Sequence, residues 1–339
     1  MLKKYIMKLQ DKENLSNNDF SEIVKVIADK KYDDNQLSAL LVLISEDSLT
    51  PDGLTSFVKN ILNYSSTFTS NQPMIDVCGT GGDGIKTINI STAVAFICAS
   101  LGVTVAKHGN RAISSSSGSS DILDILDIPL ESSIKKQEII LNNQNLSFFH
   151  APYFHRLVGE VKTIREKLGV RTVFNILGPL LHPNLGLKYQ LVGIYHKPVQ
   201  NLYAQTLQKL GRDHALIIRG DDGLDEISIT TSTKIIEVTQ KKISEFTITP
   251  EEYGFKKSSH EEIKGGNPKE NGNILINIIS GKEKGAKRDI VVLNAMFALY
   301  TANYTDSPDK AKSIIENALD SGHVYDYFTG YIKFLREAS

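Results

Sequence analysis

Residues 76–92 read DVCGTGGDGIKTINIST, a glycine-rich loop that follows an apolar strand-like run and leads directly into an apolar helix-like run. Glycine accepts positive φ and lets the backbone approach a ligand closely, so four glycines within six residues can point N–H groups at anionic oxygens. The polar side chains that follow lie near the start of the next helix, where unpaired N–H groups and the helix dipole favour negative charge. The stretch therefore predicts a strand–loop–helix unit that binds phosphate.

Strand and helix patterns alternate along the chain from residue 74 onward. Short apolar runs separated by helix-length amphipathic segments are typical of a mostly parallel sheet. Alternating Thr, Ile and Val between Ile227 and Thr249 predicts antiparallel strands added to that sheet. The polar, Gly-rich stretch Lys256–Asn273 is expected to be a mobile loop. The expected parallel strands are Met74–Val77, Val103–Ala106, Ser147–Phe149, Gln190–Tyr195 and Ala215–Arg219.

Residues 1 to about 65 carry apolar side chains at helical spacing only. Thr50 and Pro51 place a capping residue before a proline at the first helical position, which predicts the start of a helix. The polar stretch 65–73 looks like a linker. We therefore predict the α/β fold class, with a small all-helical domain at 1–70 and a larger domain at 71–339 whose mostly parallel central sheet is flanked by helices.

Composition and charge restrict the cellular context. The formal net charge of −1 leaves no general electrostatic footprint for nucleic acid. Two cysteines are too few for a disulfide framework and lack metal-ligand spacing, so a reducing intracellular compartment is the simpler interpretation. The N-terminus lacks the apolar core of a signal peptide, and no run approaches the ~18 apolar residues of a membrane span. We expect a soluble cytoplasmic protein.

A second polar cluster, VAKHGNRAISSSSGSSD at 105–121, follows the first by one strand–helix unit. It lies at the expected C-terminal end of a strand, the edge at which open α/β sheets bind ligands. Lys107 offers a point charge for a pyrophosphate, and the polar side chains through Ser119 offer many donors. Alone, either segment can be a tight turn or a flexible linker; together they favour a ligand with phosphates at both ends.

The glycine-rich loop argues against two common nucleotide chemistries. It does not end in the Gly-Lys-Ser/Thr of a Walker A motif, and it does not match Gly-x-Gly-x-x-Gly. Nucleoside triphosphate hydrolysis and dinucleotide redox chemistry therefore lose support.

Residues 220–228 put four carboxylates into six residues immediately after a strand. Asp225 and Glu226 can hold Mg²⁺ through oxygen ligands and water, and the alternative is an acidic surface turn. Either Arg165 or Arg171 can form a bidentate pair with a substrate carboxylate, although arginines in such a segment are more often surface salt-bridge residues.

Three histidines, His150, His155 and His182, are expected to be structural or surface residues because their spacing suggests no metal site. No Cys, Ser or Lys of these motifs is placed beside a base, as a covalent nucleophile requires. We therefore assign no residue as catalytic acid, base or nucleophile.

Taken together, the motifs resemble those of the anthranilate phosphoribosyltransferases of tryptophan biosynthesis, over nearly the whole chain. The resemblance is specific, because the related pyrimidine nucleoside phosphorylases share the general fold and a glycine loop but lack the Lys-His-Gly-Asn-Arg and Arg-Thr-x-Phe-Asn segments. The matching motifs are DVCGTGGDG (76–84), NIST (89–92), KHGNR (107–111), LGVRTVFNILGP (168–179), Asp225-Glu226 and RDIVVLNA (288–295).

This resemblance implies transfer of phosphoribose from 5-phosphoribosyl 1-diphosphate to the amine of anthranilate. It implies a nucleoside phosphorylase/phosphoribosyltransferase-like fold with its active site at the hinge between the two domains, part of 160–182 joining the helical domain. It further implies two Mg²⁺ ions per subunit and a homodimer formed through the helical domain, without nucleic acid or membrane. The alternatives are a pyrimidine nucleoside phosphorylase-like enzyme and a non-catalytic nucleic-acid-binding relative.

By position, the resemblance also implies roles for single residues. Those that would contact anthranilate are Gly79, Asn110 and Arg165, and those that would hold the metal are Ser91, Asp225 and Glu226. Those that would bind 5-phosphoribosyl 1-diphosphate are Gly79, Gly82, Asp83, Thr87, Asn89, Ile90, Ser91, Thr92, Lys107, His108, Gly109, Asn110, Arg111, Ala112, Ile113, Ser114, Ser115 and Ser119.

Five positions depart from the usual family pattern, and none of them removes an implied ligand. They bear on substrate affinity and on the fit of the anthranilate channel. They are Ser120 in place of Ala, Asp124 in place of Glu, Asp127 in place of Gly, Arg156 in place of Pro, and Thr163 in place of Pro.

Overall fold

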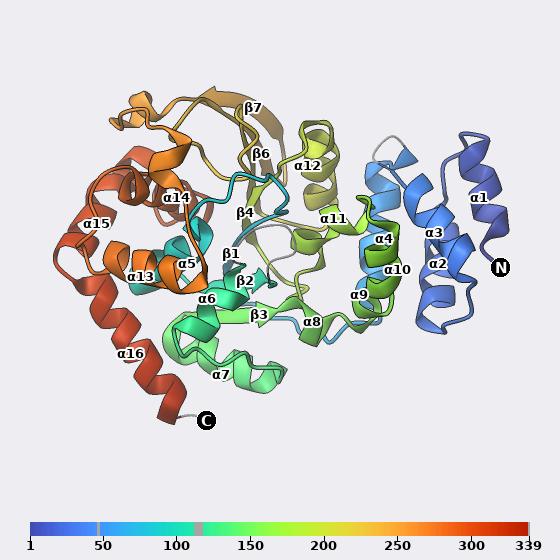
Figure 1. Cartoon of the computed structure of the whole chain (residues 1–339), viewed down its shortest axis with the longest axis horizontal. Coiled ribbons are helices and arrows are strands. Elements are labelled where there is room, and N and C mark those ends of the chain that lie inside the picture. The colour runs from blue at the N-terminus through green and yellow to red at the C-terminus, as the bar shows by residue number, and fades with distance from the viewer. Residues whose placement is uncertain (46–47, 112–117, 338–339) are drawn as a thin grey trace.

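The computed structural model describes residues 1–45, 48–111 and 118–337, and within these ranges one seven-stranded sheet organises the chain (Figure 1). The first five strands across the sheet are parallel, and the last two are antiparallel. The parallel strands are mostly buried, as in sheets covered by helices on both faces. In spatial order the strands are β3 (Leu146–His150), β2 (Val105–Gly109), β1 (Ile75–Gly79), β4 (Tyr189–Gly193), β5 (His214–Gly220), β6 (Thr233–Thr239) and β7 (Ile243–Ile248).

The five parallel strands expected from the sequence are all present, with ends that differ by a few residues. Strands β1, β2, β4 and β5 each end on a glycine, so three of them reach further along the chain than their apolar runs suggest. The expected antiparallel addition is also confirmed, although β6 begins at Thr233 and the preceding residues form turns.

The expectation of a mobile loop over Lys256–Asn273 is wrong. This stretch contains a 3₁₀ helix, η5 (His260–Ile263), and the first turns of α13 (Pro268–Ile279). Each begins with a capping box, in which Ser259 pairs with Glu262 and Asn267 pairs with Glu270. The caps satisfy backbone N–H groups that an unstructured polar loop would leave to water.

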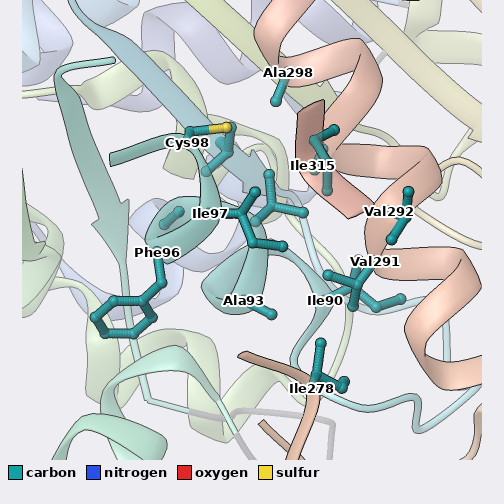
Figure 2. Packing of buried hydrophobic residues seen from close by; sticks show 14 of the residues in the cluster. Ile90, Ala93, Phe96, Ile97, Cys98, Ile278, Val291, Val292, Ala298 and Ile315 are labelled. Carbon is teal, nitrogen blue, oxygen red and sulfur yellow. The ribbon is translucent and has the colours of Figure 1, made fainter. Parts of the chain in front are cut away.

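One face of the sheet is covered by a layer of helices in the C-terminal half of the chain and by the helix that follows β1. Figure 2 shows Ile97 of that helix facing Val291 and Ile315 of the C-terminal helices, while Phe96 points the other way; all four belong to the largest apolar cluster. The helices that contribute to this side and to the adjoining edge are α5 (Ile90–Ser100), α6 (Ser119–Ile125), α7 (Ile134–Gln144), α13, α14 (Ala286–Thr301), α15 (Pro308–Asp320) and α16 (His323–Glu337).

The opposite face carries α12 (Gln200–Lys209) and the N-terminal helices, which lie at one end of the molecule in Figure 1. A single apolar cluster contains Phe57 of the N-terminal helices, Phe174 of a later short helix and Ile217 of β5. The rings of Phe57 and Phe174 meet edge to face at 6.0 Å. The helices of this group are α1 (Lys3–Gln10), α2 (Asn17–Ala28), α3 (Asp34–Leu43), α4 (Pro51–Leu62), α9 (Arg156–Glu160), α10 (Lys162–Leu168) and α11 (Phe174–Leu177), with the 3₁₀ helices η2 (Gly178–Leu181) and η3 (Lys197–Val199). The short helix α8 (Ala151–Phe154) contributes Phe154 to a third, smaller apolar cluster, and the 3₁₀ helix η4 (Pro250–Tyr253) places Tyr253 against the largest cluster.

The helix start expected at Thr50 and Pro51 is confirmed. The Thr50 side chain accepts a hydrogen bond from the Gly53 N–H at 3.0 Å, and Pro51 is the first residue of α4. No helix within the described ranges is long and apolar enough to cross a membrane.

Candidate functional site

The loops that follow the parallel strands meet at one edge of the sheet, where ligands bind in open α/β folds. The glycine-rich loop runs from β1 to α5, and the acidic turn (residues 221–232) joins β5 to β6. Their contact is direct, because the Gly81 N–H donates to the Asp225 Oδ2 at 2.7 Å. The two motifs that the sequence analysis treated separately are therefore one constellation.

The glycine-rich loop has the backbone that its sequence predicts. Gly81, Gly82 and Gly84 all have positive φ, at 66°, 86° and 77°. Asn89 then precedes the first residue of α5 as its N-cap, without a side-chain capping bond. The predicted strand–loop–helix unit is thus present, with backbone N–H groups available at a helix N-terminus.

The acidic turn packs against the ends of β1 and β4 so closely that both positions require glycine. A Cβ atom on Gly193 would lie 1.5 Å from the carbonyl oxygen of Asp225, and one on Gly79 would lie 2.3 Å from its Oδ2. Backbone proximity of this kind fixes the Asp225 carboxylate at the base of the glycine-rich loop.

Three carboxylates crowd this region. Burial and the charge of Asp83 raise the pKa of Asp225 above its ordinary value. Burial and the charge of Asp225 raise the pKa of Glu226, while the Lys107 cation acts in the opposite direction. Like-charged groups held together in this way favour a proton or a cation between them.

This donor set fits Mg²⁺, which prefers oxygen ligands and keeps several positions for water and substrate phosphates. No three His, Cys, Asp or Glu side chains gather into a metal cage in the described part of the chain. An ion held by Asp225 and Glu226 would therefore need further oxygen ligands, from hydroxyl groups, water or substrate phosphates.

Lys107 links the end of β2 to both neighbouring elements. Its Nζ is buried and donates to the Val77 carbonyl and, at 3.0 Å, to the Ser91 hydroxyl at the start of α5. The next backbone N–H, that of His108, donates to the buried carboxylate of Asp76 at 3.0 Å. The cation is thereby held beneath the glycine-rich loop.

The second polar cluster lies between β2 and α6. Ser119 and Ser120 both donate to the Asn110 carbonyl at 3.3 Å, one through its hydroxyl and the other through its N–H. Arg111 forms ion pairs with Asp121 at 3.1 Å and Asp124 at 2.7 Å. Four of the implied ligand residues, Ala112, Ile113, Ser114 and Ser115, lie outside the described residues.

Two other implied ligand residues, Ile90 and Thr92, have side chains buried in the first turn of α5. The Thr92 hydroxyl has no hydrogen-bond partner in the described part of the chain. Any contact between Ile90 and a ligand must come from its backbone, because its side chain is in the core.

The two arginines that the sequence left as alternatives occupy different environments. The Arg165 guanidinium is half-buried, lies 5.4 Å from the Phe174 ring centroid, and has no Asp or Glu within ion-pair distance in the described ranges; its burial lowers its pKa. Arg171 instead donates to the Gly82 carbonyl at 2.9 Å and covers the Tyr195 ring at 4.1 Å. Arg171 therefore supports the glycine-rich loop, a role that residue type alone does not reveal.

The histidines are buried rather than exposed. The Nε2 atoms of His155 and His108 lie 3.2 Å apart, and His182 Nε2 donates to the Ala106 carbonyl at 2.8 Å. Burial and the neighbouring His182 lower the pKa of His155 to about 4. His150 contacts the Ser120 hydroxyl through Nδ1 at 2.8 Å. The four rings, including that of the implied ligand residue His108, lie buried in the region below the site.

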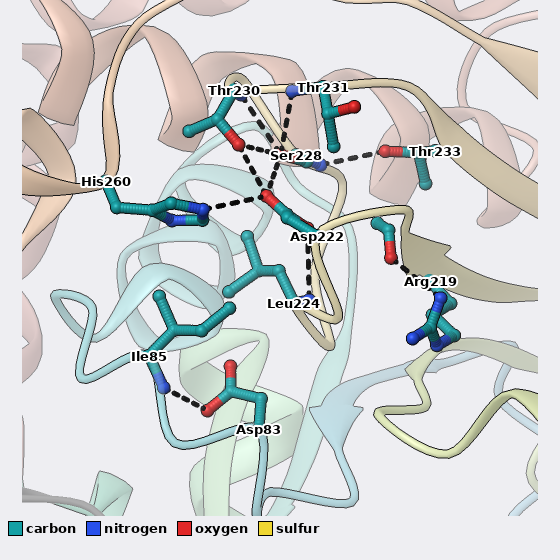
Figure 3. Close-up of polar contacts among 11 residues, drawn as sticks. Asp83, Ile85, Arg219, Asp222, Leu224, Ser228, Thr230, Thr231, Thr233 and His260 are labelled. Atoms are coloured by element: carbon teal, nitrogen blue, oxygen red, sulfur yellow. Dashed lines mark hydrogen bonds and ion pairs between the residues drawn. The ribbon is translucent and has the colours of Figure 1, made fainter.

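Sequence reasoning missed the segment that covers the two site loops, residues 258–271, which we call the strap. Ser258 donates its N–H to the Ile229 carbonyl at 3.0 Å, and Gly265 donates to the Lys86 carbonyl at 3.0 Å. Figure 3 shows His260 of the strap beside Asp222, with 3.6 Å between Nε2 and Oδ2. The capping boxes at Ser259 and Asn267 were the sequence signals that could have identified its order.

Two family models match the chain: the glycosyl transferase family helical bundle domain over residues 3–65, and the glycosyl transferase family a/b domain over residues 71–325. The chain is 42% identical over 340 residues to an anthranilate phosphoribosyltransferase of Methanosarcina acetivorans, covering 100% of this chain and 91% of that protein. It is 38% identical over 335 residues to the anthranilate phosphoribosyltransferase of Acetivibrio thermocellus, and the match covers 98% of this chain and 96% of that protein.

Solved structures are similar over the same length. A crystal structure of anthranilate phosphoribosyltransferase from Thermus thermophilus gives a TM-score of 0.90 at 32% identity, covering 98% of this chain and 99% of that one. The structure of anthranilate phosphoribosyltransferase from Saccharomyces cerevisiae, in complex with PRPP and Mg, gives a TM-score of 0.90 at 26% identity. The match covers 99% of this chain and 98% of that one.

Proposed function

The chain belongs to the anthranilate phosphoribosyltransferase family, and from this premise we propose that the loops at the C-terminal edge of its sheet form the active site. The enzyme transfers phosphoribose from 5-phosphoribosyl 1-diphosphate to the amine of anthranilate, in tryptophan biosynthesis. Nucleoside phosphorolysis and non-catalytic nucleic-acid binding are not favoured, because the full-length relatives are anthranilate phosphoribosyltransferases.

The observation that carries the proposal is the contact between the Gly81 N–H and the Asp225 carboxylate. It joins a loop suited to phosphate oxygens with carboxylates suited to a divalent cation. The residues proposed to bind 5-phosphoribosyl 1-diphosphate are those implied by the family motifs: Gly79, Gly82, Asp83, Thr87, Asn89 to Thr92, Lys107 to Ser115, and Ser119.

We propose that Ser91, Asp225 and Glu226 hold Mg²⁺, with two ions per subunit. The raised pKa values of both carboxylates support this, because a cation would offset their mutual repulsion. When bound, the metal supplies positive charge that stabilises the diphosphate leaving group. The yeast relative was solved with PRPP and Mg.

The protein's own contribution is positioning and fixed electrostatics. We propose that the glycine-rich loop and the buried Lys107 beneath it lie beside the place where negative charge grows as diphosphate leaves. The anthranilate amine is already nucleophilic, so alignment with the anomeric carbon is the main requirement and no side-chain base is assigned.

Arg165 is proposed to bind the anthranilate carboxylate, with Gly79 and Asn110 as further contacts. Its half-buried guanidinium, without an acidic partner among the described residues, supports this role because a planar cation of that kind pairs well with a carboxylate.

We propose that the helical domain comprises residues 1–70 with part of 160–182, and that residues 71–339 form the second domain. The packing of α9 against α2 and of α10 against α3 supports the discontinuous boundary. A homodimer through the helical domain is supported by exposed Met7 and Val42 on α1 and α3, and the mass in solution measured by light scattering tests it. The near-neutral charge and two buried free cysteines support a cytoplasmic protein without nucleic acid.

The decisive experiment compares wild-type protein with Asp225→Asn and Glu226→Gln in an anthranilate fluorescence assay over a range of Mg²⁺ concentrations. We expect each variant to lower kcat/KM by about a hundredfold or more and to raise the Mg²⁺ concentration needed for half-maximal rate. Asp221→Asn is the matched control, because Asp221 lies in the same turn but is exposed and bonded to Ser232. Unchanged Mg²⁺ dependence in both site variants would remove the two carboxylates from the site.

A further inference from the structure

The strap runs beside the part of the glycine-rich loop that enters α5. Lys264 and Thr87 form an antiparallel bridge, and the Ile88 N–H donates to the Ile263 carbonyl at 3.2 Å. Together with the bond from Gly265 to Lys86, these contacts give residues 86–88 a partner along their backbone. The loop's geometry on this side is therefore set by a segment from the distant part of the sequence.

Gly265 lets the two backbones approach. A Cβ atom at this position would lie 2.7 Å from the Thr87 carbonyl oxygen and 2.6 Å from the Asn271 Oδ1. Any side chain here would push the strap away from Thr87, so the contact depends on glycine.

Asn271 connects the strap to the first residue before α5. It is buried at 1% exposure, and its Oδ1 accepts the Gly266 N–H at 2.7 Å. Its Nδ2 donates to the Asn89 Oδ1 at 3.0 Å. An amide has one accepting and one donating end, so the bond from Asn271 engages the accepting end of Asn89.

A phosphate oxygen requires a donor, which is the opposite end of the Asn89 amide. We propose that Asn271 is a positioning residue: it fixes the amide of Asn89 with its N–H donors toward 5-phosphoribosyl 1-diphosphate, while the strap holds Thr87 beside it. This inference rests on the proposed assignment of Thr87 and Asn89 to that substrate. Asn271 itself touches no substrate and acts through Asn89.

The variant Asn271→Asp tests whether Asn271 orients the Asn89 amide or only stabilises the fold. The carboxylate keeps an oxygen for the Gly266 N–H but has no N–H for Asn89, and it attracts the donating end of Asn89 instead. The Asn89 amide then turns its oxygen toward the substrate. We expect KM for 5-phosphoribosyl 1-diphosphate to rise about tenfold, with kcat and KM for anthranilate changed less than about twofold.

Asn273→Asp is the matched control, because it introduces the same charge at an exposed position of the same helix and should leave all three constants unchanged. Asn89→Ala should raise the same KM, and adding Asn271→Asp to it should have no further effect. Gly265→Ala is the second variant and should also raise this KM selectively, because its Cβ would meet both the Thr87 carbonyl and the Asn271 side chain. Thermal unfolding of each variant shows whether it is folded.

The inference is overturned if Asn271→Asp and Gly265→Ala leave KM for 5-phosphoribosyl 1-diphosphate unchanged while Asn89→Ala raises it. It is also overturned if kcat and both KM values change together with the melting temperature, since that pattern marks a merely structural residue. If folded wild-type protein does not turn over anthranilate and 5-phosphoribosyl 1-diphosphate, the proposed function is contradicted. The positioning role of Asn271 is then contradicted as well. Calorimetric titration of each variant with 5-phosphoribosyl 1-diphosphate, in the presence of Mg²⁺, measures the dissociation constant of this substrate without turnover. The variants are then compared by that constant in place of KM.

Discussion

Ser120 illustrates, at the scale of the residue, how a departure from the family pattern is accommodated. Its hydroxyl lies 2.8 Å from the His150 Nδ1, and both side chains are buried. Ser120→Ala should leave the imidazole nitrogen without a partner and lower the free energy of unfolding by about 1–3 kcal/mol. Urea denaturation measures the loss.

The control for this prediction is the double variant with His150→Phe, which has no ring nitrogen to satisfy. In that background Ser120→Ala should cost much less, because no polar group is left unpaired. An equal cost in both backgrounds would show that the hydrogen bond contributes nothing.

Single residues also show where sequence reasoning stops. The sequence identified Arg165 and Arg171 as equivalent candidates, because a guanidinium suits any carboxylate. Only the fold shows that Arg171 donates to the Gly82 carbonyl. Asn271 was missed altogether, since its partner Asn89 is 182 positions away and no local pattern records that contact.

At the scale of the element, apolar runs were sufficient to locate the strands but not their ends, because several strands continue to a glycine beyond the apolar run. The alternation that predicted a strand from Ile227 was misleading because Ser228 and Thr230 donate their hydroxyls to the Asp222 carboxylate. These bonds hold residues 228–230 in a turn, a preference of Ser and Thr that competes with strand pairing.

A histidine on β5 and a glutamate on β6 form a hydrogen bond between the two strands. Glu237 of β6 accepts from His214 of β5 at 2.8 Å and from the Tyr300 hydroxyl of α14 at 2.6 Å. These bonds, led by that from His214, hold the pKa of Glu237 below its ordinary value. Because the folded pKa is lowered, the stabilisation is complete above about pH 4.5 and is lost as pH falls through the folded pKa.

Glu237→Gln should therefore lower the free energy of unfolding by about 1–3 kcal/mol at pH 7, and the difference from wild type should shrink below pH 4.5. Chemical denaturation across this range measures it. Glu245→Gln on β7 removes an exposed carboxylate paired with Lys234 and serves as control, with little effect at any pH. A Glu237→Gln difference that stays constant with pH would contradict the assignment.

At the scale of the whole molecule, the resemblance to a family gave information that periodicity did not. Helical spacing in residues 1–65 indicated helices but not that α9 and α10 would join them. The connecting stretch 65–73 is itself tied to distant segments, because the Ser66 N–H donates to the Phe154 carbonyl and Phe68 donates to the Pro183 carbonyl. Long-range contacts of this kind have no local signature.

His155 lies where these parts meet, between the Ser65 hydroxyl at 2.9 Å and His108 at 3.2 Å. Its lowered pKa, about 4, means that between pH 6.5 and pH 4 the unfolded chain takes up a proton that the folded chain does not. Stability must therefore fall as pH falls through this window, by on the order of 3 kcal/mol for this residue.

Replacing His155 with Asn should flatten the slope of unfolding free energy against pH between 6.5 and 4, although it also lowers stability at pH 7. Denaturant titrations at several pH values measure the slope. His323→Asn, at an exposed position on α16, is the control for the replacement itself. Parallel curves for wild type and His155→Asn would contradict the prediction.

The apolar cluster shared by the N-terminal helices and one sheet face has a consequence for modularity. The α4 helix packs against α12 and η2, so its side chains are shaped to this particular sheet. Residues 1–64 therefore cannot be exchanged for the corresponding helices of a relative without disturbing this packing. In a recombination experiment with a relative 42% identical, crossovers placed in the linker should yield mismatched cores and few folded chimeras. The two units depend on each other, because the helices of residues 1–64 share their apolar cluster with one face of the sheet.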